Sequence, residues 1–239
     1  RTAELIKYAA NAFLATKITF INEIADLAEK VGADVQEVAR GIGLDNRIGS
    51  KFLHAGPGFG GSCFPKDTRA LVKIAQDHDV QLRIVEAVLG VNDIRKRAMA
   101  RKVSNAAGGS LRGKTVAVLG LTFKPDTDDM REAPSIPLVT GLLDMGAKVR
   151  AHDPVGIEQA RRELPDIDYF DDPYDCLRGA DAMVVVTEWV QYRTLDLERV
   201  KAAMAQPVVV DLRNIYRRED MAAHGFVYDS VGRASEPGV

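Results

Sequence analysis

The chain has 239 residues, of which 46% are hydrophobic and 28% charged, the ordinary profile of a globular protein. Lys and Arg number 32 against 34 Asp and Glu, so the net charge of −2 provides no basic field to favour nucleic acid. No apolar run approaches the ~20 residues of a membrane span. Because 2 cysteines do not make a disulfide framework, we expect a cytoplasmic protein. The length predicts one or two domains.

The first 31 residues predict one long helix. Apolar residues recur at helical spacing from Leu5 to Val31, and Gly32 supplies a stop. At about 30 residues this helix is longer than the usual ~8–20, and such helices often cross an oligomer interface. We therefore expect a homodimer or higher homo-oligomer that assembles through it. Because the chain opens on Arg1 and is helical almost at once, we also expect it to begin inside a longer protein.

Shorter helices and a glycine-rich loop complete the N-terminal half. Residues 34–43 begin with an acidic capping pattern and end on glycine, which predicts a second helix. Residues 46–63 are typical of a loop, and residues 65–78 and 83–109 predict two further helices. The sequence therefore predicts an all-α domain over residues 1–107.

From residue 112 onward, short apolar runs alternate with helical patterns. Strands that alternate with helices predict a mainly parallel sheet with right-handed crossovers, and such sheets bind ligands beyond the carboxyl ends of their strands. We therefore expect an α/β fold: the helical domain, then a Rossmann-like doubly wound domain over residues 112–239. The predicted strands are residues 115–121, 148–154, 167–170, 182–188, 207–213 and 226–229.

The predicted sheet domain lacks the glycine fingerprint of dinucleotide-binding folds. After the first strand the chain reads Leu-Thr-Phe-Lys rather than G-x-G-x-x-G, so a pyrophosphate cannot lie on the backbone in the usual way. The same loop offers Lys124 and Arg131, which suit a phosphate by charge, although a solvated polar turn explains them equally well. Arg213 ends a predicted strand, where a doubly wound sheet places ligand contacts.

Cys63 follows the glycines and precedes a predicted helix. A buried structural thiol is one interpretation, whereas a metal ligand is disfavoured because no second Cys or His lies at ligand spacing. The helix N-terminus, with Lys66 and Arg69 nearby, favours a thiolate and hence a nucleophile. His54 in the same loop is a candidate base, but no third group nearby in sequence would orient it. Cys176 is most simply a packing residue.

Three segments together resemble the UDP-glucose 6-dehydrogenase family, within the wider UDP-glucose/GDP-mannose dehydrogenases. Residues 3–27 are similar to its central helix, residues 44–67 to its catalytic loop, and residues 119–136 to the start of its nucleotide-sugar domain. The segment around Cys63 is highly specific, and the order of the three segments adds to that specificity. No metal site is part of this resemblance.

The resemblance implies two successive NAD-dependent oxidations that convert UDP-glucose to UDP-glucuronate. It makes Cys63 the nucleophile and Asp67 the carboxylate that helps to activate water. Lys7 and Asn11 share a helix face; their spacing alone suggests only exposed polar residues, but the resemblance makes them stabilise oxygen charge at the reacting carbon.

The resemblance also implies the ligand contacts. Arg47 would reach the nucleotide sugar from a partner subunit, although by spacing alone it is a solvent-exposed loop residue. Lys66 and Arg131 would contact NAD. The sugar nucleotide would be held by Phe52, Leu53, His54, Ala55, Gly56, Phe59, Gly60, Phe123, Lys124 and Arg213.

One departure from the family keeps other hypotheses open. Family members carry an N-terminal domain with the G-x-G-x-x-G fingerprint and a catalytic glutamate, which this chain does not contain. We therefore expect the chain alone to be inactive. The alternatives are a relative that uses GDP-mannose or UDP-N-acetyl sugars, and a non-catalytic sugar-nucleotide-binding or dimerisation module. Intact Cys63, Lys7 and Asp67 argue against the latter.

Overall fold

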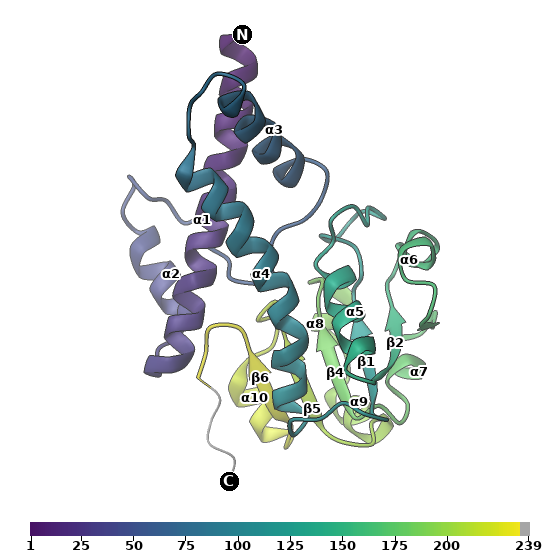
Figure 1. Ribbon diagram of the computed structural model, residues 1–239. Coiled ribbons are helices and arrows are strands. Elements are labelled where there is room, and N and C mark those ends of the chain that lie inside the picture. Colours follow the sequence, from purple (N-terminus) through teal and green to yellow (C-terminus); the bar gives the residue numbers. More distant parts are fainter. Residues whose placement is uncertain (235–239) are drawn as a thin grey trace. The chain divides into compact units, whose positions relative to one another are not determined.

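The computed structural model describes residues 1–234, which form two compact units (Figure 1). The first unit comprises residues 1–95 together with residues 231–234, and the second comprises residues 96–230. The chain passes from one unit to the other within helix α4 (Arg83–Ala106), and it re-enters the first unit after the last strand.

The first unit is helical, as the sequence predicts. It contains α1 (Thr2–Val31), α2 (Val35–Gly43), α3 (Phe64–Gln76) and the first half of α4. Helix α1 buries a face of mainly small side chains, so that neighbouring elements can approach it closely. These buried residues are Ala12, Ala15, Thr19, Ile21, Asn22, Ala25 and Ala28.

A second face of α1 is apolar but exposed within the chain. Ile6, Phe13, Phe20 and Leu27 are 63%, 65%, 49% and 56% exposed, respectively, and they recur every seven residues. A seven-residue apolar repeat is the pattern of a helix that packs along another helix. The long helix therefore carries two apolar faces, and the unit itself covers one of them.

The second unit contains a six-stranded parallel sheet with the order β3-β2-β1-β4-β5-β6. This is the doubly wound order, in which strands on either side of β1 are reached by crossovers of opposite direction. The predicted α/β fold is confirmed, although β3 is only 2 residues long. The strands are β1 (Thr115–Leu119), β2 (Lys148–His152), β3 (Asp168–Tyr169), β4 (Ala182–Val185), β5 (Val208–Asp211) and β6 (Val227–Ser230).

Helices connect the strands, and the central strands are buried throughout. Almost every residue of β1, β4 and β5 is enclosed, which explains their continuous Val, Leu and Ala runs. No described helix combines the length and apolarity needed to cross a membrane. The connecting helices are α5 (Ser135–Asp144), α6 (Ile157–Glu163), α7 (Pro173–Leu177), α8 (Val190–Arg193), α9 (Leu197–Ala203) and α10 (Arg218–Ala223).

Candidate active site and nucleotide-binding edge

Asp67 lies at the centre of a polar cluster in the first unit. Its side chain is buried in the first turn of α3, and Nδ2 of Asn11 on α1 donates a hydrogen bond of 2.6 Å to its Oδ2. Nζ of Lys7 lies 3.6 Å from the same oxygen, and the Lys7 side chain is 63% exposed. The other carboxylate oxygen, Oδ1, is buried and has no hydrogen-bond partner among the described residues. The predicted residues Lys7, Asn11 and Asp67 therefore form one group.

Cys63 lies one helical turn before Asp67, as the N-cap residue of α3. The Asp67 amide N–H donates to the Cys63 carbonyl oxygen at 2.8 Å, so the two side chains share one face of the helix. The Cys63 thiol is exposed, whereas Cys176 is buried in the second unit. Desolvation raises the pKa of the Cys176 thiol to about 12. Of the two cysteines, Cys63 is thus the one with an accessible thiol, and it lies at the positive end of the α3 dipole.

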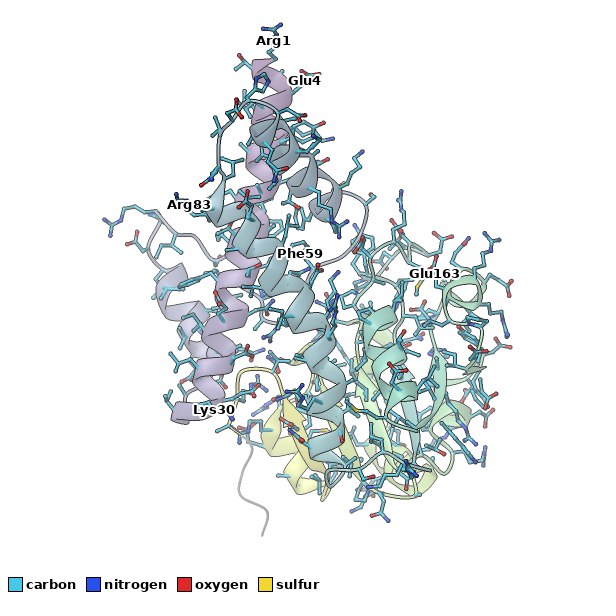
Figure 2. The ribbon with its side chains drawn as sticks, in the orientation of Figure 1. Arg1, Glu4, Lys30, Phe59, Arg83 and Glu163 are labelled. Atoms are coloured by element: carbon cyan, nitrogen blue, oxygen red, sulfur yellow. The ribbon has the colours of Figure 1, made fainter. Side chains whose placement is uncertain are left out.

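The glycine-rich loop before Cys63 is largely buried. Phe59, labelled in Figure 2, lies beside α4 and packs with Phe64 at a ring-centroid distance of 6.0 Å. Phe64 also meets the ring of Phe52 at 6.0 Å, although it was not among the predicted site residues. Gly58 has φ 114°, a backbone conformation that is strained for any residue with a Cβ atom, so this position requires glycine. Leu53, Gly56, Phe59 and Gly60 are buried, Phe52 and Ala55 are half-buried, and His54 is exposed.

Other predicted residues of the first unit lie at the surface. Lys66 is exposed in the first turn of α3. Arg47 is exposed and forms an ion pair with Asp45 at 2.6 Å. The hydrogen bond from Arg47 holds the pKa of Asp45 below its usual value. Within the chain, Arg47 is therefore held by a neighbouring carboxylate rather than by the Asp67 cluster.

Three predicted contacts of the second unit meet at the carboxyl edge of the sheet. Arg213 follows β5, and its Nε donates to the carbonyl oxygen of Val186 at 2.7 Å, while its Nη2 reaches the carbonyl oxygen of Phe123 at 3.5 Å. Nζ of Lys124 lies 5.5 Å from the Phe123 ring centroid. The guanidinium of Arg213 also pairs with Glu188 at 3.0 Å. The loops after β1, β4 and β5 thus place an aromatic ring and two cations together.

Arg131 belongs to the same stretch of chain but is paired locally. It binds Asp129 through two side-chain hydrogen bonds of 2.9 and 2.7 Å. The hydrogen bond from Arg131 lowers the pKa of Asp129. Contact with a cofactor phosphate would therefore require Arg131 to share or exchange this partner.

Two buried carboxylates that the sequence analysis missed organise this edge. Asp153, after β2, accepts hydrogen bonds from the backbone N–H groups of Leu121 (2.7 Å), Thr122 (3.2 Å) and Gly156 (2.7 Å). Asp211, at the end of β5, accepts from the backbone N–H groups of Arg213, Ile215 and Tyr216. Both lie at the carboxyl end of a strand, and that position was the available signal, because such residues lie at the ligand edge of a doubly wound sheet.

The sheet lacks the usual features of a dinucleotide site at the end of β1 and of β2. The Asp153 carboxylate is occupied by the chain's own backbone, so it is not free to bind a ribose as the acidic residue of a dinucleotide fold does. Gly120 has φ 88°, and a Cβ there would lie 2.5 Å from Cβ of Thr187, so this glycine serves internal packing. The missing fingerprint and the occupied carboxylate agree, so the loop after β1 and the end of β2 lack the two features by which a Rossmann fold binds a dinucleotide.

Both units match domain models of one known protein family. Residues 1–94 match the central domain of the UDP-glucose/GDP-mannose dehydrogenase family, and residues 117–218 match the UDP-binding domain of the same family. The chain belongs to this family. The resemblance found in the sequence is therefore confirmed, and the carboxyl edge of the sheet lies within a UDP-binding domain.

Individual relatives agree with this assignment. The chain is 65% identical to a UDP-glucose 6-dehydrogenase of Rhizobium meliloti over 233 residues. The aligned region covers 98% of the chain and 53% of that protein. A UDP-glucose dehydrogenase structure from Pyrobaculum islandicum matches with a TM-score of 0.87 at 41% identity, over 98% of the chain and 52% of its own. An NDP-N-acetyl-D-galactosaminuronic acid dehydrogenase structure from Methanosarcina mazei matches with a TM-score of 0.86 at 32% identity, over 98% and 51%. The chain thus spans about half the length of the curated relatives that it matches.

Proposed function

We propose that this chain supplies the nucleophile and the sugar-nucleotide contacts of an NAD-dependent dehydrogenase that oxidises UDP-glucose twice, to UDP-glucuronate. One observation carries the proposal: an exposed Cys63 lies one helical turn before a buried Asp67 that holds Lys7 and Asn11. The 65% identity to a UDP-glucose 6-dehydrogenase supports the choice of substrate.

In this proposal the Cys63 thiolate adds to the aldehyde carbon left by the first oxidation. A C–S bond forms, and the carbonyl electron pair moves to oxygen, where the Lys7 ammonium and the Asn11 amide stabilise it. Groups in such positions contribute about 3 kcal/mol each. NAD, when bound, supplies the acceptor for the hydrides that leave the sugar carbon. Loss of hydride from the thiohemiacetal carbon gives a thioester on Cys63.

Hydrolysis of the thioester needs a base, and Asp67 is placed to act as one. Its Oδ2 is engaged by Asn11 and Lys7, whereas Oδ1 is free to take a proton from water. The hydroxide attacks the thioester carbon, the C–S bond breaks, and Cys63 leaves as thiolate. The carboxylic acid so formed then loses its proton to solvent, which gives the sugar carboxylate. In this proposal Asp67 therefore acts as the base, while Lys7 and Asn11 stabilise charge on the substrate oxygen.

The contacts to the nucleotide sugar follow the resemblance, residue by residue. We propose that the loop of residues 52–60 surrounds the sugar nucleotide and that Phe123, Lys124 and Arg213 bind it at the sheet edge. Lys66 and Arg131 would contact phosphates of NAD. These roles follow the domains predicted over residues 1–107 and 112–239, the first helical and catalytic and the second nucleotide-binding.

A second copy of the chain is part of the proposal. The exposed face of Ile6, Phe13, Phe20 and Leu27 would pair with the same face of a partner across a two-fold axis. Arg47 lies outside the Asp67 cluster of its own chain and is exposed, which is compatible with a contact to the partner's nucleotide. The site would then be complete only in the dimer.

The experiment is a substrate assay on the full-length protein. UDP-glucose should yield two equivalents of NADH per sugar, followed by absorbance, whereas the isolated 239-residue chain should yield none. The Methanosarcina mazei relative favours an N-acetylated sugar as the second candidate substrate. Higher kcat/KM for a UDP-N-acetyl sugar or for GDP-mannose than for UDP-glucose would overturn the choice of sugar.

A further inference from the structure

Three buried polar side chains contact the glycine-rich loop, and none has a part in the mechanism above. They are Asn22 on α1, and Asn92 and Arg95 on α4, with exposed fractions of 2%, 4% and 5%. Asn92 and Arg95 lie three residues apart and face the same way on their helix. Buried amide and guanidinium groups cost free energy unless they find partners, and here their partners are backbone atoms of the loop.

The Asn92 side chain forms hydrogen bonds to both backbone polar groups of Phe59. Its Oδ1 accepts from the Phe59 N–H at 2.8 Å, and its Nδ2 donates to the Phe59 carbonyl oxygen at 3.1 Å. The Phe59 ring packs at the same time against Ala15 and Val88. Both the peptide groups and the ring of this residue are therefore fixed, which removes the main freedoms of the loop at that point.

Gly56 is held in the same way by two side chains. Its N–H donates to Oδ1 of Asn22 at 2.9 Å, and its carbonyl oxygen accepts from Nε of Arg95 at 2.6 Å. Nη1 of Arg95 also donates to the Asn22 carbonyl oxygen at 3.1 Å and to Asp26 at 2.7 Å, so α1 and α4 are bound to each other at this point. The guanidinium has little room to move.

We propose that Asn22, Asn92 and Arg95 are positioning residues that hold the loop of residues 55–61 in its ligand-binding conformation before the ligand arrives. This rests on the proposed function, in which the loop surrounds the sugar nucleotide. Pro57 and Gly58 lie between the two fixed residues, so the stretch that would meet the ligand is held at both ends. A loop that is already ordered loses little conformational entropy when the ligand binds, and the affinity is higher for that reason.

The test uses Asn92→Leu, which keeps the size of the side chain and removes both hydrogen bonds, with Asn105→Leu as the control on the exposed side of the same helix. In the full-length protein, amide hydrogen exchange in residues 55–61 should accelerate by about tenfold or more, with α1 and α3 unchanged. The Kd for UDP-glucose should rise by about tenfold, while Cys63 alkylates at the wild-type rate. The control should match the wild type in all three.

Arg95→Lys is the second variant, for the case in which Asn92→Leu does not fold. Lysine retains the charge near Asp26 but cannot bind the three oxygens at once, so the loop should again exchange faster and Kd should rise. Loop exchange at the wild-type rate, or faster exchange with an unchanged Kd, would overturn the proposal. A wild-type protein that does not bind UDP-glucose would refute the proposed function instead, and loop exchange would still decide whether these side chains hold the loop.

Discussion

Asn11 on α1 and Asp67 on α3 are 56 positions apart in sequence, yet a 2.6 Å hydrogen bond joins Nδ2 of one to Oδ2 of the other. The bond engages one oxygen of a carboxylate that is only 1% exposed and leaves the other oxygen without a hydrogen-bond partner among the described residues. An unsatisfied buried polar atom costs about 1–3 kcal/mol. The arrangement is therefore poor for stability and well suited to a group that must accept a proton.

Replacing Asp67 with Asn keeps the shape of the side chain and removes the base. We expect kcat for UDP-glucose oxidation by the full-length protein to fall by about 10²–10⁴-fold, with the Kd measured by calorimetry little changed. The control is Asp77→Asn, since Asp77 lies just beyond the other end of α3 with its side chain 54% exposed. Near-normal turnover by Asp67→Asn would exclude Asp67 as the base.

The exposed apolar face of α1 should control assembly. Phe20→Asp places a charge in the middle of the seven-residue repeat, and burying an unpaired carboxylate in an interface is costly, so we expect monomers by analytical ultracentrifugation. The control is Val80→Asp, at a residue 52% exposed outside α1, which should leave the dimer intact. A wild-type protein that sediments as a monomer at micromolar concentration would contradict the proposed interface.

His152 should make the second unit sensitive to acid. Its Nδ1 lies 2.8 Å from Oη of Tyr192, and this hydroxyl donates to the His152 carbonyl oxygen at 2.9 Å, so the tyrosine oxygen is left to accept from a proton on Nδ1. Desolvation lowers the pKa of His152 from 6.5. The unfolded chain therefore binds more protons between the folded pKa and 6.5, and the free energy of unfolding falls as the pH drops through that window.

His152→Gln should remove this dependence. The loss of unfolding free energy per pH unit, at most about 1.4 kcal/mol for one group, should be smaller in the variant than in the wild type. Urea denaturation above and below the window measures it, with His78→Gln as an exposed control. Equal acid dependence in His152→Gln and wild type would show that another group is responsible.

The two cysteines should differ strongly in reactivity. Cys63 is exposed at a helix N-terminus, whereas burial raises the pKa of the Cys176 thiol to about 12, which keeps it protonated near neutral pH. Iodoacetamide should therefore modify the peptide that contains Cys63 first, as followed by mass spectrometry. Faster modification of Cys176 would remove the basis for Cys63 as nucleophile.

The sequence predicted elements well and long-range contacts poorly. Continuous apolar runs marked the central strands β1, β4 and β5, which are almost wholly buried. The resemblance indicated Cys63 and Asp67, which lie within one helical turn of each other. Asn92 and Arg95 escaped notice because they bind backbone atoms, which carry no residue-specific signal. Their one detectable sign was a pair of polar residues on the buried face of α4, in line with Val88 and Met99.

The most direct test of the account is the mass of the full-length Cys63→Ser variant after incubation with UDP-glucose and NAD. A serine ester hydrolyses more slowly than a thioester, so the acyl sugar nucleotide should accumulate on the peptide that contains residues 62–66. Cys176→Ser, the control, should turn over normally and carry no adduct. An adduct on that peptide is the result we predict. A Cys63→Ser variant that forms UDP-glucuronate at the wild-type rate, with no adduct, would contradict covalent catalysis by Cys63.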